Sequence, residues 1–126
     1  MSTFVPLYKL NVYLLSRQLS AIGWRIYSAL DWSTKKIIGE QFIRSTDSVG
    51  ANIAEGYARF HYLDKIKFYY NARGSLAETD DHWLELLKER GLIVDKEYRE
   101  FKVIAKNLQI KLNSFISATY KAKAYP

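Results

Sequence analysis

The chain has 126 residues, of which 48% are hydrophobic and 25% are charged, and 19 Lys and Arg against 13 Asp and Glu give it a net charge of +6. This composition is typical of one ordinary globular domain and excludes a disordered chain. The absence of cysteine excludes disulfides and thiolate metal sites, and two histidines are too few for a histidine-based metal centre.

Long apolar runs are missing from the sequence. No stretch approaches 18 uncharged apolar residues, so we expect no membrane span. The first ten residues place no charged segment ahead of an apolar core, so we expect no signal peptide. We therefore expect a cytoplasmic protein with no membrane partner.

Helical periodicity predicts four helices, over residues 6–30, 34–58, 62–90 and 95–120. Pro6 is suited to a first helical turn, Ser33 or Thr34 can cap the second helix, and Gly91 is suited to the left-handed cap that ends the third. Each helix carries a stripe of residues spaced three and four apart. The stripes are Leu15, Leu19, Ile22, Ile26 and Ala29; Ile38, Phe42, Ser45, Val49, Asn52 and Gly56; Ile66, Tyr69, Ala72, Leu76, Thr79, Trp83 and Leu87; and Tyr98, Phe101, Ala105, Leu108, Leu112, Phe115 and Thr119.

These four helices predict an all-α fold. Both prolines lie near the ends of the chain, no segment alternates like a strand, and the connections are short. The spacing of the stripes suits the shallow crossing angles of helical bundles. We therefore expect one domain, residues 1–126, folded as an antiparallel up-down-up-down four-helix bundle.

Two segments in the middle of the chain carry small and polar residues where a bundle ordinarily places leucine. They are residues 44–59 and residues 71–78. Gly50 and Gly74 lie inside predicted helices, where glycine costs about 1 kcal/mol relative to alanine. Such glycines are useful where another backbone or a bulky side chain comes close.

The sequence NIAEG, followed shortly by Arg59, and the sequence ARGSLAE in the next helix resemble the four-helix-bundle 23S rRNA-intervening sequence proteins. The resemblance implies a ring-forming homopentamer and carries over no catalytic residue. Those proteins are distantly similar to the accessory variability protein of diversity-generating retroelements, which partners a reverse transcriptase and RNA. Gly50 stands where the commoner pattern has proline, so we expect a weak point or bend there.

The polar motif residues allow two interpretations. A network between helices would fix helix register or a subunit interface, with opposite charges on adjacent helices partly buried together. Alternatively, the same residues form a ligand or RNA site. The candidate residues are Arg44, Ser45, Asn52, Glu55, Arg59, Arg73, Ser75 and Glu78.

Basic residues are concentrated in the first and last predicted helices, which are neighbours in an up-down bundle. A shared basic face would attract phosphate backbones, whereas the simpler alternative is a set of solvated lysines that keep the domain soluble. The candidate nucleic-acid contacts are Lys9, Arg17, Arg25, Lys102, Lys106 and Lys111.

The sequence lacks the patterns of common enzymes. A di-iron site needs Glu-x-x-His pairs, but Glu78 and His82 are four apart; the arginine–histidine spacing of RNA-cleaving HEPN bundles and the phosphate-binding glycine loops are also absent. We expect no catalytic residue, no metal and no cofactor. An acidic stripe can pair locally, meet the basic helices of a neighbouring subunit or be a solvated face; it comprises Glu78, Asp81, Glu85 and Glu89.

The sequence thus predicts a non-enzymatic oligomeric module that binds structured or ribosomal RNA through basic helix surfaces. The alternative is an oligomeric scaffold that recruits a protein partner, such as a reverse transcriptase. The expected partners are other copies of the chain, RNA, or a protein.

Overall fold

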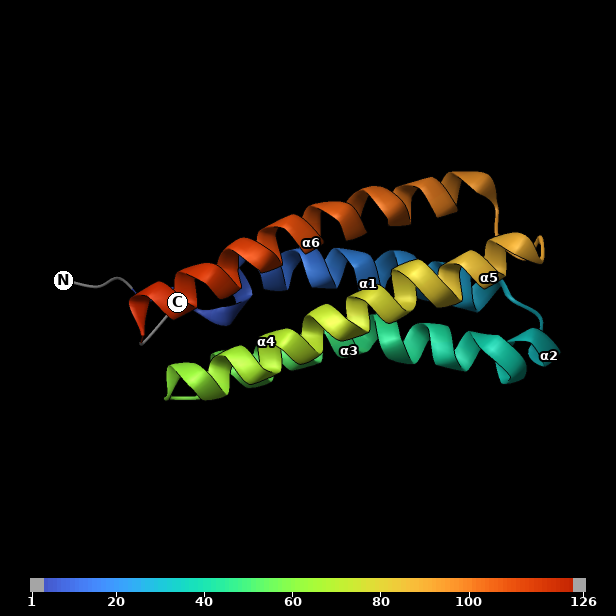
Figure 1. The fold of residues 1–126 in the computed structure, drawn as a ribbon. Coiled ribbons are helices and arrows are strands. Elements are labelled where there is room, and N and C mark those ends of the chain that lie inside the picture. The colour runs from blue at the N-terminus through green and yellow to red at the C-terminus, as the bar shows by residue number, and fades with distance from the viewer. Residues whose placement is uncertain (1–3, 124–126) are drawn as a thin grey trace.

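Four antiparallel helical rods form the bundle in the computed structural model, which describes residues 4–123 (Figure 1). The first rod is α1 (Asn11–Ala29) and the last is α6 (Asp95–Ala122). The second joins α2 (Trp32–Thr34), a π-helical segment (Lys35–Gly39) and α3 (Glu40–Tyr57). The third joins α4 (Tyr62–Ala77), a π-helical segment (Glu78–Trp83) and α5 (Leu84–Glu89).

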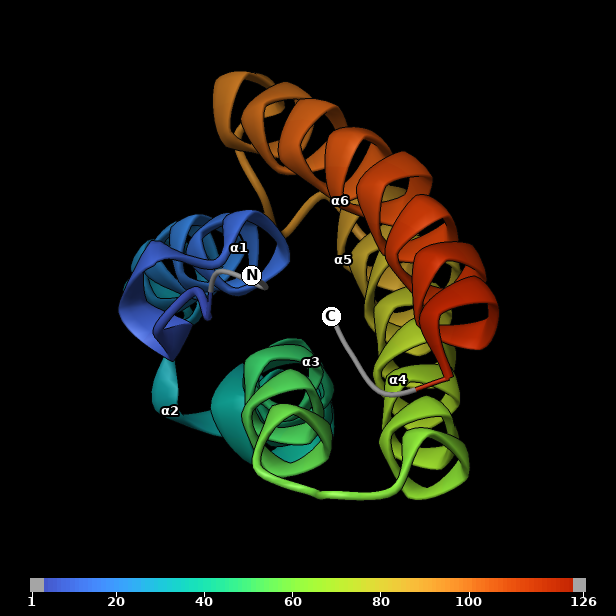
Figure 2. The same cartoon turned by 90° about the vertical axis from the view of Figure 1, so that its left-hand side faces the viewer.

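The rods surround a single core. Viewed along the bundle, α1 packs on α3 and α6, and α4 packs on the same two neighbours (Figure 2). Between residues 4 and 123 the chain forms no strand, so the predicted all-α, up-down-up-down fold is confirmed. In that range, no helix is long and apolar enough to cross a membrane.

The first helix begins later than predicted. Pro6 precedes a 3-10 turn (Leu7–Lys9), and the extended backbone of Leu10 separates this turn from Asn11. Phe4 and Val5 lie beside the end of α3, where the Phe4 ring stacks on Tyr57 and the Tyr57 hydroxyl donates a hydrogen bond to the Val5 carbonyl. The N-terminal segment therefore lies against the bundle instead of extending α1.

Asp31, rather than Ser33 or Thr34, caps the second rod. Its carboxylate accepts a hydrogen bond from the Thr34 backbone N–H at 2.7 Å, and that bond holds the pKa of Asp31 below its usual value. The helix begins at Trp32 as a result. Gly91 has a φ of 67° in the turn after α5, and the Leu92 N–H bonds to the Leu87 carbonyl at 2.9 Å, which completes a left-handed cap.

The core follows most of the predicted stripe positions, and the clearest departure is at one helical step in the third rod. Thr79 and Leu84 are both fully buried although they are five residues apart, and Trp83 is only partly buried. The π-helical segment causes this difference because it inserts one residue into the helical repeat. The first stripe also ends earlier than predicted, since Ala29 is exposed.

The predicted weak point at Gly50 does not interrupt α3, which continues as an α-helix through that residue. A Cβ at Gly50 would lie 2.8 Å from the hydroxyl oxygen of buried Ser16 on α1. The glycine therefore allows α1 and α3 to approach closely.

Candidate nucleic-acid interface

The uncharged motif residues join α3 to α4 through hydroxyls. The Asn52 amide donates to the Ser48 carbonyl at 2.9 Å and lies 3.0 Å from the Ser48 hydroxyl, which accepts from the Ser75 hydroxyl at 3.1 Å. Ser45 is buried and donates to the carbonyl of Phe42 in its own helix. This part of the expected network is present and connects adjacent helices.

The charged motif residues do not join that network. Glu55 of α3 pairs at 2.9 Å with Arg59, which lies just after the end of that helix, and both side chains are about half exposed. Arg73 donates to the Asn113 side chain of α6 at 3.2 Å, and Glu78 accepts from the Trp83 indole at 2.7 Å. Arg44 is exposed beside a small hollow that Ser75 and Glu78 also line. The expected partly buried charge pairing between adjacent helices is wrong, because these charged side chains are all exposed.

The six basic candidates differ in their surroundings. Arg17 lines a groove between α1 and α3, whereas Arg25 pairs with Glu100 of α6 at 2.9 Å. Lys9, Lys106 and Lys111 are exposed. Arg25 is thus paired with an acid across α1 and α6, and the other four residues named here stay candidates for nucleic-acid contacts.

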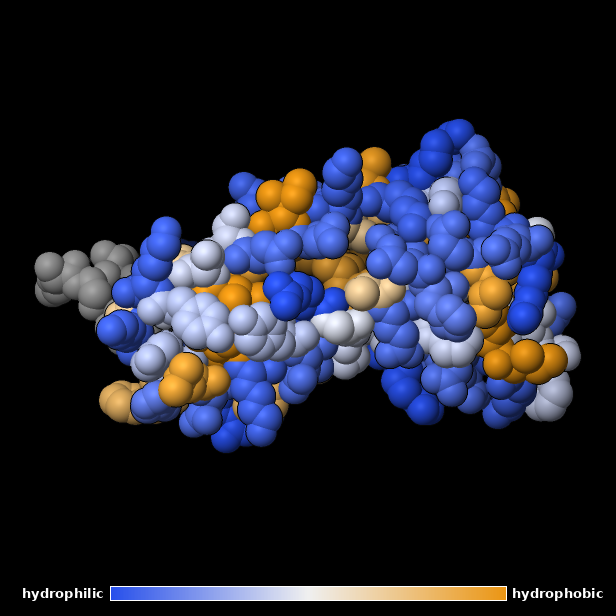
Figure 3. Space-filling view, in the orientation of Figure 1, coloured by the Kyte–Doolittle hydropathy of each residue, from blue (hydrophilic) through white to orange (hydrophobic). Residues whose placement is uncertain are grey.

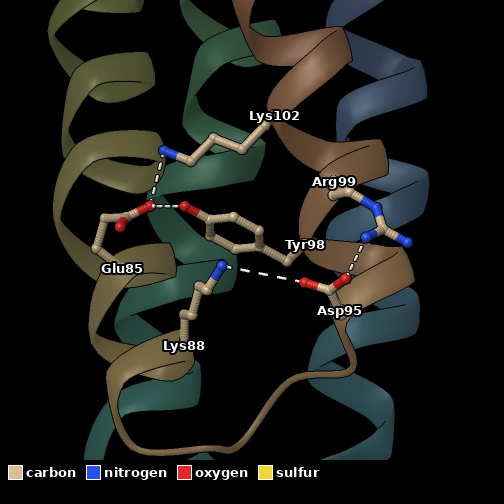
Figure 4. Close-up of polar contacts among 6 residues, drawn as sticks. All are labelled: Glu85, Lys88, Asp95, Tyr98, Arg99 and Lys102. Atoms are coloured by element: carbon tan, nitrogen blue, oxygen red, sulfur yellow. Dashed lines mark hydrogen bonds and ion pairs between the residues drawn. The ribbon is translucent and has the colours of Figure 1, made fainter.

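Lys102 is held in a polar cluster of α5 and α6 (Figure 4). Its amine lies 2.9 Å from the Glu85 carboxylate and 3.3 Å from that of Asp80, and it donates to the Asp80 carbonyl at 2.8 Å. The Tyr98 hydroxyl donates to the same Glu85 oxygen at 2.6 Å. These bonds tie the π-helical segment to α6 and leave Lys102 poorly placed to contact phosphate.

The two carboxyl groups of this cluster have opposite pKa shifts. Burial raises the pKa of Asp80, although the nearby Lys102 opposes this. Hydrogen bonds from Tyr98 and Lys102 lower the pKa of Glu85. Burial alone would lower the pKa of Lys102, but its bonds to the two acids raise it. The cluster is a structural contact in which one ammonium group bonds to two carboxyl groups.

Charge separates along the bundle axis, which the linear sequence does not show. The half that contains both described chain ends and the α3–α4 connection comprises residues 4–20, 45–76 and 108–123, and we call it the basic half (Figure 1). It has nine Lys and Arg and only three Asp and Glu, a net charge of +6. The balanced half, residues 21–44 and 77–107, has ten of each. All of the net charge therefore lies in the basic half.

Apolar and aromatic side chains are scattered among the charges on the surface. Figure 3 shows hydrophobic patches at both ends of the bundle, surrounded by hydrophilic atoms. In the basic half the exposed rings include Phe4, Tyr8, Phe60, Tyr70 and Tyr120. Protein surfaces that bind single-stranded nucleic acids commonly combine exposed aromatic rings with basic side chains.

The described residues also show no arrangement of metal-binding side chains. Across residues 4–123, no group of three or more His, Cys, Asp or Glu is placed to hold a metal ion. His61 Nδ1 accepts from the Leu63 backbone N–H at 3.2 Å, and the His82 ring contacts Trp83 edge-on. Both histidines therefore have structural contacts.

Comparisons with known proteins agree with this fold. A solved structure from Bacteroides thetaiotaomicron, of a protein with unknown function from the S23 ribosomal protein family, superimposes with a TM-score of 0.74. It is 24% identical, and the match covers 83% of this chain and 97% of that one. No curated protein matches the chain. The family model of the 23S rRNA-intervening sequence proteins matches residues 8–114. The chain, whose NIAEG and ARGSLAE segments lie on adjacent helices of a four-helix bundle, therefore belongs to the 23S rRNA-intervening sequence protein family.

Proposed function

We propose that this protein is a non-enzymatic oligomeric module that binds RNA with the basic half of its bundle. The observation that supports this most is the separation of charge, +6 in the basic half against zero in the balanced half. A concentrated positive potential attracts phosphate backbones and accelerates encounter. An even distribution of the same lysines would give solubility without a binding end.

If RNA binds the basic half, the side chains expected to contact it differ from the six candidates chosen from the sequence. Lys9, Arg17 and Lys111 remain candidates because they lie in this half, whereas Arg25 and Lys102 form ion pairs in the balanced half. Three further exposed lysines of the basic half join the candidates: Lys67, Lys121 and Lys123.

The test is RNA binding by two triple variants that remove equal charge. One replaces Lys67, Lys121 and Lys123 with alanine in the basic half, and the control replaces exposed Arg90, Lys96 and Lys106 in the balanced half. A labelled RNA hairpin is titrated between about 50 and 200 mM salt. We expect the first variant to bind more weakly, with a salt slope that is smaller by about one for each phosphate it no longer neutralises. Equal weakening in the two variants would refute binding at the basic half.

We propose that several copies of the chain assemble, and the structural feature that supports this is Gly74. It is exposed inside α4, and a Cβ there would meet no atom of another helix within 4 Å. A glycine in such a position weakens the helix without serving the bundle, so we infer that it admits a neighbouring subunit. Light scattering is expected to report about five chain masses, as the family resemblance implies for a closed ring. A Gly74→Leu variant is expected to dissociate, and a monomeric parent protein would refute assembly.

The protein-scaffold alternative is favoured by two apolar residues on the outer face of α6. Val103 and Ile110 are seven residues apart and are 67% and 55% exposed. If the chain assembles but binds no RNA at low salt, this face becomes the candidate surface for a protein partner.

A further inference from the structure

A groove of about 690 Å³ lies at the end of the basic half, beside the α3–α4 connection. Phe4 from the N-terminal segment and Tyr57 from α3 line it together with residues 58–62, and Lys65 and Lys123 also contribute. This volume is within the range of small-ligand pockets in proteins. It is therefore large enough for one nucleotide.

Lys65 gives the groove a buried charge. The residue is only 4% exposed, and its amine donates to the Tyr57 carbonyl at 2.9 Å. Among residues 4–123, no carboxylate lies within ion-pair distance of that amine. An ammonium group has three N–H donors, and a buried charge without a counter-ion is costly. An anion in the groove would supply the missing charge and acceptors.

Aromatic rings give the same groove flat apolar surfaces. Phe60 lies in the connection between the helices and is 97% exposed, the most exposed of the large hydrophobic residues in the described chain. His61 stacks on Tyr62 with ring centroids 5.2 Å apart, and Phe4 stacks on Tyr57 at 5.8 Å. Every nucleobase has a face that can stack on such rings.

We propose that this groove binds an unpaired nucleotide of single-stranded RNA, with the base stacked on Phe60 or His61 and a phosphate oxygen accepting from the Lys65 amine. The proposal rests on the RNA-binding function above and specifies its site and its substrate class. Rings beside a buried cation match the alternation of base and phosphate along a single strand, whereas paired bases of a duplex cannot enter the groove. An acidic peptide fits the groove less well, because its carboxylates could bind the Lys65 amine but it has no planar ring beside each charge to stack on the aromatic side chains.

The experiment measures fluorescence anisotropy of an unstructured RNA of about ten nucleotides, a matched abasic strand and a matched duplex. Phe60→Ala is compared with Trp32→Ala, which removes a 75% exposed ring from the balanced half. Lys65→Met is compared with Lys96→Met, which removes an exposed charge from the balanced half. Phe60 is fully in solvent, so its variant is expected to fold; circular dichroism checks the fold of Lys65→Met.

We expect the wild type to prefer the single strand over the abasic strand and the duplex. Phe60→Ala and Lys65→Met are each expected to bind the single strand about tenfold more weakly, and the controls are expected to change little. If the wild type binds the RNA hairpin but Phe60→Ala binds the single strand normally, the groove proposal is wrong and the proposed function stands. Equal binding of the abasic strand overturns base stacking. Binding of no RNA overturns both proposals.

Discussion

The hydroxyl of Thr46 in α3 lies 2.6 Å from the hydroxyl of Thr79 in the π-helical segment of the third rod, and both residues are fully buried. Thr46 is also 2.8 Å from the Phe42 carbonyl. The Thr79 hydroxyl lies farther from the same carbonyl, at 3.4 Å. Each hydroxyl has one hydrogen, and the shorter distance to Phe42 favours Thr46 as the donor to that carbonyl and Thr79 as the donor to Thr46. The pair is a fully buried polar connection between these two rods and lies at the step where the helical repeat changes.

Because of these hydrogen bonds, we expect substitution of Thr46 and substitution of Thr79 to lower the free energy of unfolding by different amounts. Thr46→Val removes the acceptor of the short Thr79 hydrogen bond and is expected to cost about 1–3 kcal/mol, because the buried Thr79 hydroxyl keeps only the longer 3.4 Å contact with the Phe42 carbonyl. Thr79→Val leaves Thr46 bonded to Phe42 and is expected to cost less than about 1 kcal/mol. Urea denaturation measures both free energies of unfolding. The double variant is expected to cost less than the sum of the singles, and additive costs would contradict the coupling.

Two glycines with open space around their Cβ positions predict opposite effects. Gly74→Ala is expected to raise the free energy of unfolding of the isolated subunit by about 1 kcal/mol, because Gly74 lies within a regular helix. Dilution below the assembly threshold, monitored by light scattering, separates this effect from any weakening of the subunit interface.

Gly91→Ala is expected to lower the free energy of unfolding by about 1 kcal/mol, because its φ of 67° disfavours a side chain. Thermal melts followed by circular dichroism provide the measurement. Gly91→Asn is the matched variant, since asparagine tolerates this conformation better and should be less destabilising than alanine. A neutral Gly91→Ala would mean that the cap relaxes without strain.

In the Asp80–Lys102–Glu85 cluster, the two carboxyl groups are expected to change the stability of the fold in opposite directions as the pH changes. The pKa of Glu85 is lowered below 4.5 by its hydrogen bonds, so its stabilisation is present above that pH and disappears as the pH falls through the folded-state value. Glu85→Gln is therefore expected to reduce stability at about pH 7 and to weaken the acid dependence, both of which urea denaturation at a series of pH values would measure.

Asp80 behaves in the opposite sense. Burial raises its pKa above 3.8, so its charged form destabilises the folded protein, and this cost disappears as the pH falls below the folded-state pKa. Asp80→Asn is expected to raise Tm by a few degrees at about pH 7 and to have less effect at about pH 3. A lower Tm at neutral pH would show that the contact with Lys102 outweighs the burial of Asp80.

Periodicity in the sequence was sufficient to predict four helices and most of the core. Leu19, Phe42, Leu76 and Leu108 are buried as their spacing indicated, because a helix that packs on neighbours must place apolar residues on one face. The step from Thr79 to Leu84 was not predictable, because a pattern based on 3.6 residues per turn assigns Trp83 to the core instead.

The candidate site was less predictable than the fold. Along the sequence, the excess of positive charge lies near the two ends of the chain. In the bundle, however, each rod runs from one end of the molecule to the other, so each contributes residues to both halves. The basic half therefore became visible only with the helices assembled. The burial of Lys65 was likewise hidden, since a lysine between Asp64 and Lys67 resembles a solvated residue.

Both described ends of the chain lie at the basic half, and Phe4 and Lys123 line the groove itself (Figure 1). An affinity tag or reporter fused to either terminus would therefore stand beside the surface that a binding assay is meant to probe. The turn after α5 is at the opposite end of the bundle, and its Val94 is 61% exposed. Because these 126 residues include no cysteine, Val94→Cys would give them a unique attachment point for a fluorophore that leaves the groove unobstructed.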